Sequence, residues 1–309
     1  MKLNPYQKTA FATVFATLFL ILVGGLVRAA GAGLGCPDWP KCFGTWIPPT
    51  NVVDLPPEFE ASQFNVWKTW IEYVNRLVGV VIGLLIIATF VRSFRYRKSV
   101  PSVFYSSGAA FVLVLVQGWL GGQVVKTGLS EWMITIHMIL ALIIVNVLVY
   151  ASFKSATEFI KIELSEAVRK KLFITGSVLL GITFIQLVLG TQVREAIDVI
   201  KEADGIIPPR STWIGKVGDI FSIHRSFSWL VLISGAVLMY FVYRPKLSGP
   251  IFKLANLNFV FILSQIAAGV ILEYFDMPPA FQVVHLVGIA LMVCAQFLML
   301  LMLRLRVTD

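Results

Sequence analysis

Eight long apolar blocks dominate the sequence and decide what the chain can fold into. A helix that crosses the hydrocarbon core of a membrane needs about 20 mostly apolar residues. The composition agrees, with 57% hydrophobic residues, only 14% charged residues and a mean hydropathy of +0.81. The sequence therefore predicts an all-α polytopic membrane protein and excludes a soluble domain, a disordered chain and a disulfide scaffold. The eight predicted spans cover residues 8–27, 71–91, 103–122, 131–153, 172–193, 221–243, 250–272 and 281–303.

The net charge of +9 is divided unevenly between the two sides of this layout. With eight spans both termini lie on one side, and that side carries sixteen of the 26 Lys and Arg residues but only four of the 17 Asp and Glu residues. Positive charge marks the cytoplasmic side of a membrane protein. We therefore expect both termini in the cytoplasm and no nucleic-acid partner.

The two halves of the chain share landmarks at matching spacings. Because each half has four spans, both insert in the same orientation, as a parallel repeat of two four-helix bundles. We expect an N-terminal half over residues 1–155 and a C-terminal half over residues 156–309. The repeat-related pairs are Arg28 with Arg194, Asn75-Arg76 with His224-Arg225, Gln117 with Gln265, and His137 with His285.

The chain has three histidines, and each lies about one turn inside the outer end of a predicted span. An ionisable residue within a span is by default a functional candidate, although a lone one is more simply satisfied by a hydrogen bond across its bundle. His224 and His285 belong to two spans of the C-terminal half and can face each other, which suits the two axial positions of a haem iron. Zinc is less favoured, because no further Cys, Asp or Glu lies nearby at the spacing of zinc ligands. All three histidines are predicted near the outer face.

The N-terminal half has His137 but carries Asn75 where the repeat predicts a second histidine. Asn is a poor iron ligand, so a haem in this half would have one strong protein ligand. We therefore expect one permanent haem in the C-terminal half and one exchangeable haem in the N-terminal half. The alternative is that position 75 marks a degenerate site that binds nothing.

Glu72 precedes Asn75 by three residues, so the two share one face of their helix. A carboxylate beside a haem edge can act as a general base or stabilise developing positive charge. The competing interpretation is a salt bridge to Arg76 or Lys68. Arginines at the outer ends of spans can pair with haem propionates, although snorkelling to the interface is an equal alternative. These arginines are Arg28, Arg76, Arg194 and Arg225.

Two cysteines, Cys36 and Cys42, lie in the first outer loop. Their spacing is that of neither a thioredoxin motif nor a zinc site. An oxidising outer face favours a disulfide between them, with either a structural role or exchange with a redox partner.

These residues together resemble the haem A synthase family over nearly the whole chain. The resemblance rests on the eight spans, on the GLVRAAGAGLGCPDWPKCFG segment at 25–44, on Glu72-Tyr73-Val74-Asn75-Arg76, on Gly190-Thr191-Gln192-Val193-Arg194 and on the three histidines. It implies an oxidoreductase that converts haem O to haem A by oxidising a ring methyl to a formyl group, for cytochrome c oxidase assembly. It also implies a haem b held by His224 and His285, with the iron of the substrate haem at His137 near Glu72. Many relatives read E-x-x-H-R where this chain has Asn75, so it lacks one of the family's four histidines.

The resemblance implies haem O synthase and the oxidase assembly machinery as partners, with a quinone as a candidate electron acceptor and membrane lipid around the spans. Two other functions fit some of the residues. A non-enzymatic membrane b-type cytochrome needs only His224 and His285, and a haem carrier fits a weak N-terminal site. Glu72 and the cysteine loop favour the enzyme, because an electron relay needs neither. A transporter is less favoured, since no pair of spans is broken by Gly or Pro at the membrane midplane.

Overall fold

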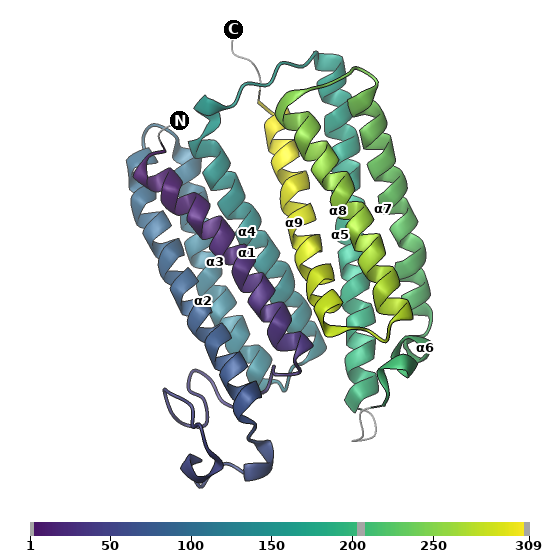
Figure 1. Ribbon diagram of the computed structural model, residues 1–309. Helices are drawn as coiled ribbons and strands as arrows, with labels where there is room; N and C mark the ends of the chain where they lie inside the picture. Colours follow the sequence, from purple (N-terminus) through teal and green to yellow (C-terminus); the bar gives the residue numbers. More distant parts are fainter. Residues whose placement is uncertain (1–2, 203–207, 306–309) are drawn as a thin grey trace. The chain divides into compact units, whose positions relative to one another are not determined.

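The computed structural model describes residues 3–202 and 208–305, and all regular elements within them are helical. The chain divides into two compact units with a boundary between Thr157 and Glu158. The first unit contains the helices α1 (Pro5–Ala29), α2 (Val66–Ser93), α3 (Pro101–Lys126) and α4 (Glu131–Ser155). The second contains α5 (Glu166–Glu202), the short α6 (Trp213–Val217), α7 (Asp219–Tyr243), α8 (Gly249–Tyr274) and α9 (Pro279–Leu303) (Figure 1).

The first unit is a four-helix bundle in which α1 packs on α2, α2 on α3, α3 on α4, and α4 back on α1. Its centre is apolar and includes Ile82 and Ile86 of α2 with Ile144 and Leu148 of α4. Polar contacts join the helices toward one end, where Tyr6 hydrogen-bonds Ser107 at 2.8 Å. Side-chain hydroxyls and amides are tolerated in a membrane bundle when they hydrogen-bond across its helices.

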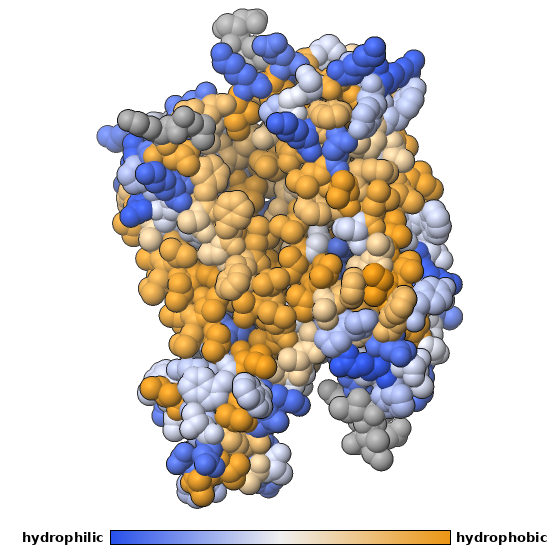
Figure 2. All heavy atoms as spheres, viewed as in Figure 1, coloured by the Kyte–Doolittle hydropathy of each residue, from blue (hydrophilic) through white to orange (hydrophobic). Residues whose placement is uncertain are grey.

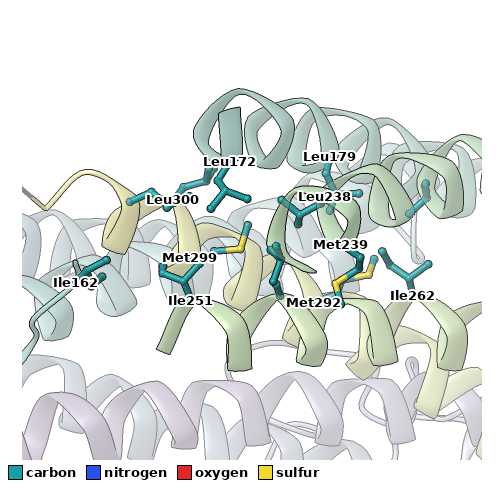
Figure 3. Packing of buried hydrophobic residues seen from close by; sticks show 14 residues of the cluster. Ile162, Leu172, Leu179, Leu238, Met239, Ile251, Ile262, Met292, Met299 and Leu300 are labelled. Carbon is teal, nitrogen blue, oxygen red and sulfur yellow. The ribbon is translucent and has the colours of Figure 1, made fainter. Parts of the chain in front are cut away.

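The second unit has the same ring of neighbours, with α5 on α7, α7 on α8, α8 on α9, and α9 back on α5. All four long helices contribute apolar side chains that point toward one another in its core (Figure 3). Leu179 of α5, Leu238 of α7 and Met299 of α9 are almost completely buried. The helices of this unit are therefore held together along their length by side-chain packing.

Local sequence signals set the ends of the helices. Asn4 and Gln7 form a capping box at the start of α1, and Pro5 occupies its first position. Asn65 caps α2 by accepting a hydrogen bond from the amide of Lys68 at 3.1 Å. Gly218 has a φ of 76° and separates α6 from α7, a conformation that favours glycine.

The predicted spans are confirmed: eight of the described helices are long and apolar enough to cross a membrane. Large apolar side chains such as Phe15, Val80 and Val260 lie exposed on the outside of their helices. On the face shown in Figure 2, hydrophobic residues cover the middle of the helices and hydrophilic residues gather at their ends. Such a surface suits lipid around the middle and water at both ends.

Helix α5 continues well beyond its predicted span, which ended at residue 193. It has 37 residues and a length of about 55 Å, against about 30 Å for the hydrocarbon core. Its last turns carry an ion-pair ladder in which Asp198 lies 3.3 Å from Arg194 and 3.0 Å from Lys201. The apolar pattern ends at residue 193, whereas these i,i+3 and i,i+4 ion pairs support the helix beyond it.

Candidate functional site

Each of the three histidines lies against a glycine of a neighbouring helix. A Cβ added at Gly121 of α3 would lie 3.4 Å from Cε1 of His137, and one at Gly190 of α5 would lie 3.1 Å from Cε1 of His224. At Gly269 of α8 the corresponding distance to His285 is 3.9 Å. The missing side chains let the Cε1 edge of each ring approach the next helix, most closely at Gly190.

His224 of α7 and His285 of α9 face each other inside the second unit. Their ring centroids are 6.4 Å apart and their planes cross at 72°. A metal–imidazole bond is about 2.0 Å and the ring centre lies about 1.1 Å behind the bonding nitrogen, so two imidazoles on opposite sides of one iron have centroids about 6.3 Å apart. The observed separation therefore suits a haem iron between the rings.

The nitrogen atoms of the histidines are also consistent with a missing partner. Nδ1 of His137, His224 and His285 is buried, and none of the three has a hydrogen-bond partner within the described part of the chain. Over residues 3–202 and 208–305 there is also no cluster of three or more His, Cys, Asp or Glu side chains that could hold a bare metal ion. Two facing imidazoles suit a metal that brings its own equatorial ligands, as haem iron does.

In the first unit, α2 presents Asn75 and Glu72 on one face. Oδ1 of Asn75 is buried and has no hydrogen-bond partner among the described residues. Glu72 is only 4% exposed, and both its carboxylate oxygens are engaged. Oε2 accepts a hydrogen bond from the amide of Cys36 at 2.8 Å, and Oε1 lies 2.5 Å from Nη2 of Arg76. The salt bridge considered from the sequence is thus present, and it fixes the carboxylate at the end of the bundle.

Arg76 joins this carboxylate to the cysteine loop. Its Nη1 donates to the carbonyl oxygens of Asp38 and Lys41, both at 2.8 Å, and its Nη2 donates to that of Cys36 at 3.2 Å. A guanidinium has five donors, and here most of them serve the loop. Arg76 therefore holds the loop against α2 through these hydrogen bonds, a role that the sequence alone did not indicate.

The loop itself is closed by the predicted Cys36–Cys42 disulfide, which the structure confirms. Asp38 accepts hydrogen bonds from the amides of Phe43 and Gly44, at 2.6 and 3.0 Å. The ring of Trp39 lies against α3, 2.8 Å from the place where a Cβ of Gly122 would be. Gly122 follows the glycine that supports His137, so the loop covers the bundle beside that histidine.

The family of cytochrome oxidase assembly proteins (COX15-CtaA) has a model that matches residues 7–297. The chain belongs to this family. The match also confirms the family resemblance seen in the sequence.

Similar members of the cytochrome oxidase assembly protein family are named as haem A synthases. The Heme A synthase of Orientia tsutsugamushi (strain Boryong) is 26% identical over 332 residues, which cover 91% of either chain. That of Rickettsia felis (strain ATCC VR-1525 / URRWXCal2) is 23% identical over 326 residues, 92% of this chain and 94% of the relative. The Heme A synthase of Shouchella clausii (strain KSM-K16) is 31% identical over a shorter stretch of 132 residues, 42% of this chain and 39% of the relative.

The other arginines predicted to bind propionates have different surroundings in this family member. Nη1 of Arg28 lies 3.6 Å from Sδ of Met138, the residue after His137. Arg194 donates to Oε1 of Gln282 at 2.9 Å, and Arg225 pairs with Glu273 at 2.7 Å. Arg28 thus contacts the residue that follows a histidine, whereas Arg225 is more than half exposed and engaged by a carboxylate.

Three residues of the site had no role predicted from the sequence. Gln186 and Gly190 contact His224, and Trp39 covers the bundle next to His137. The first two belong to a Gln-x3-Gly pattern that occurs three times in the chain, at 117–121, 186–190 and 265–269. That pattern was a signal available in the sequence, whereas the docking of Trp39 depends on the path of the loop.

Proposed function

We propose that this member of the family is a haem A synthase, an oxidoreductase that converts the ring methyl of haem O to the formyl group of haem A for cytochrome c oxidase biogenesis. The observation that carries the proposal is the pair His224 and His285 at a separation suited to one iron, with His137 alone in the other unit. The relatives named Heme A synthase, similar over nine-tenths of both chains, support it.

The proposed architecture is a parallel pseudo-repeat of two four-helix bundles in a bacterial plasma membrane, with residues 1–155 and 156–309 as its halves. The same ring of helix neighbours in both units supports the repeat. The basic residues on the side of the termini support cytoplasmic termini, with the haem sites toward the outer face.

The C-terminal half is proposed to hold a resident haem b, with His224 and His285 as axial ligands. When bound, this group supplies one-electron transfer. The protein contributes two imidazoles seated against Gly190 and Gly269, and a four-helix enclosure that excludes water. Arg194 and Arg225 are the proposed partners of its propionates.

The N-terminal half is proposed to bind haem O as substrate, with His137 as the one histidine ligand and Asn75 on the α2 side. Arg28, which contacts Met138 next to His137 in the sequence, is a proposed propionate partner, as is Arg76. The cysteine loop, docked through Arg76 and Trp39, keeps water from the end of this bundle.

Glu72 is proposed as the catalytic carboxylate of this half, either as the general base or as the group that stabilises developing positive charge. Its place on the same helix face as Asn75 supports this role. Because Arg76 and the amide of Cys36 hold both oxygens, the carboxylate is kept in one orientation. Cys36 donates its amide to Glu72 and also forms the disulfide with Cys42, so the loop can respond to changes at the substrate site.

The proposed partners follow from the reaction. Haem O synthase supplies the substrate, the oxidase assembly machinery receives the product, and a quinone in the surrounding lipid accepts electrons. Asn75 favours two competing functions, a haem carrier and a bis-histidine cytochrome without chemistry, because it leaves the N-terminal half with one histidine.

The test is the haem content of cells that make haem O, compared with and without this protein, by extraction and mass analysis. Haem A or its hydroxymethyl precursor is expected only in cells with the protein. Bound haem b with haem O unchanged, when reductant, oxygen and a quinone acceptor are all present, would overturn the synthase in favour of the cytochrome or carrier.

A further inference from the structure

Three copies of one short pattern, Gln-x3-Gly, lie on helices next to the three histidines. The copies are Gln117–Gly121 on α3, Gln186–Gly190 on α5 and Gln265–Gly269 on α8. These helices pack on α4, α7 and α9 respectively, and each of those carries one histidine. Because residues i and i+4 lie on the same helix face, the Gln and the Gly of each copy both point toward the histidine's helix.

In two copies the glutamine holds the histidine residue directly. Nε2 of Gln117 donates to the carbonyl oxygen of His137 at 3.1 Å and lies 3.1 Å from its ring Nε2. Nε2 of Gln186 donates to the carbonyl oxygen of His224 at 3.0 Å and lies 3.5 Å from its ring Nε2. The amide therefore fixes the backbone of the histidine while the glycine one turn further receives the ring.

In the third copy the glutamine is packed against the turn that follows the histidine. Gln265 is 9% exposed, and its Nε2 lies only 2.0 Å from the place where a Cβ of Gly288 would be. Gly288 is three residues beyond His285 on α9. Neither amide atom of Gln265 has a hydrogen-bond partner within residues 3–202 and 208–305. A buried amide without partners beside an axial histidine is costly unless a bound group or water satisfies it.

The fourth position of the repeat lacks the pattern. Arg28 and Arg194 correspond, so Gly24 on α1 corresponds to Gly190, and Leu20 stands where the other half has Gln186. Helix α1 packs on α2, which carries Asn75 in the place of His224. A Cβ added at Gly24 would meet nothing within 4 Å, so no ring fills the space above it. The glutamine and the histidine are thus missing together.

We propose that the Gln-x3-Gly unit is the seat of an axial histidine, and that Gln117, Gln186 and Gln265 are positioning residues for His137, His224 and His285. The corresponding Leu20–Gly24 position on α1 lacks this glutamine, and α2 carries Asn75 in place of a histidine. The site around Asn75 is therefore built for a haem with one imidazole ligand, because both the second histidine and the glutamine that would position it are absent. This inference rests on the proposed function only for the identity of the bound haems. Partners that orient a metal-ligating histidine commonly change metal affinity about 10–100-fold when removed.

The first test removes one seat from the purified full-length protein. Gln186→Leu recreates the residue found at position 20, and Gln186→Met keeps the length of the side chain without its donor. We expect both to change the electron paramagnetic resonance signal and midpoint potential of the resident haem b, and to weaken its retention by about 10–100-fold. The control is Thr175→Val on the same helix, whose hydroxyl bonds only carbonyls of α5. Wild-type signal, potential and retention in both Gln186 variants would overturn the proposal.

The second test introduces the missing histidine and the missing glutamine into the N-terminal half. It still decides the question if the Gln186 variants do not accumulate. Asn75→His alone is expected to leave the N-terminal haem mainly with one imidazole, whereas Asn75→His with Leu20→Gln should convert it to the low-spin, two-imidazole form. Complete conversion by Asn75→His alone, or none in the double variant, would overturn the seat. Both tests measure haem ligation and not haem O conversion. If the wild-type protein converts no haem O, the proposed synthase activity is refuted, whereas the proposed role of the Gln-x3-Gly unit is unaffected.

Discussion

The tightest contact in the proposed resident haem site is the one between Gly190 and the ring of His224, and enlarging Gly190 tests it. An added Cβ would lie 3.1 Å from Cε1 of the ring, whereas ordinary carbon contacts are 3.4–4 Å. With Gly190→Ala the ring must move by about 0.3 Å or more. With Gly190→Val the branches reach about 1.5 Å further, so the ring must leave its place on α5.

The size of the effect follows from the cost of overpacking. An extra carbon forced into a well-packed site costs about 1–3 kcal/mol. If that cost falls on the haem-bound state, in which the ring is held by a metal bond of about 2.0 Å, retention of haem b weakens by about 5–150-fold. The loss of haem b retention is expected near the lower limit of this range for Gly190→Ala, and at or beyond the upper limit for Gly190→Val.

The assay is the haem b content of the purified protein, measured as haem per chain during dilution or competition with a haem acceptor. The matched control is Gly181→Val on the same helix, because a Cβ at Gly181 meets nothing within 4 Å. Loss of haem b in Gly190→Val with full content in Gly181→Val is the predicted result. Equal and complete content in both would refute the assignment of this contact to a haem ligand.

Three further predictions concern the first unit and the stability of the second. Glu72→Gln should keep the resident haem b and lose haem O turnover, measured by mass analysis of the product; an unchanged rate would remove the carboxylate from the mechanism. Replacing Cys36 and Cys42 together by Ser should speed proteolysis of the loop that carries them and lower the occupancy of haem O while haem b stays, and equal losses of both haems would contradict a local role. Arg169, 8% exposed, donates to the buried carbonyls of residues 303 and 162. Arg169→Met should therefore cost about 1–3 kcal/mol for each carbonyl left without a donor and lower the thermal midpoint, whereas Lys170→Met at the exposed neighbouring position should not.

The membrane layout could be predicted from the sequence because its physical cause is local. A span must be apolar over about 20 residues whatever it packs against, and all eight spans were found this way. Helix α5 is the exception, because its apolar pattern ends at residue 193 while the helix continues to Glu202, supported by the ion pairs of Asp198. The end of a membrane segment and the end of a helix are set by different forces.

The chemistry of the site could be predicted only in part. Three histidines in apolar spans are conspicuous, because such residues are rare there. Arg76 was expected at a propionate, and its contacts with loop carbonyls depend on where a loop of more than 30 residues folds back. Gln186 was overlooked because its pattern becomes informative only when the neighbouring helix is known.

The central claim is that each half of the chain holds its own haem, with two imidazoles in one half and one in the other. The most direct measurement is the number, type and ligation of haems in the purified full-length protein after growth with haem O. We expect a two-imidazole haem b that His224→Ala removes without loss of the haem O-derived group. We also expect a one-imidazole haem O or its product that His137→Ala removes without loss of haem b. Loss of both haems in either variant, or a two-imidazole form in both halves, would contradict it.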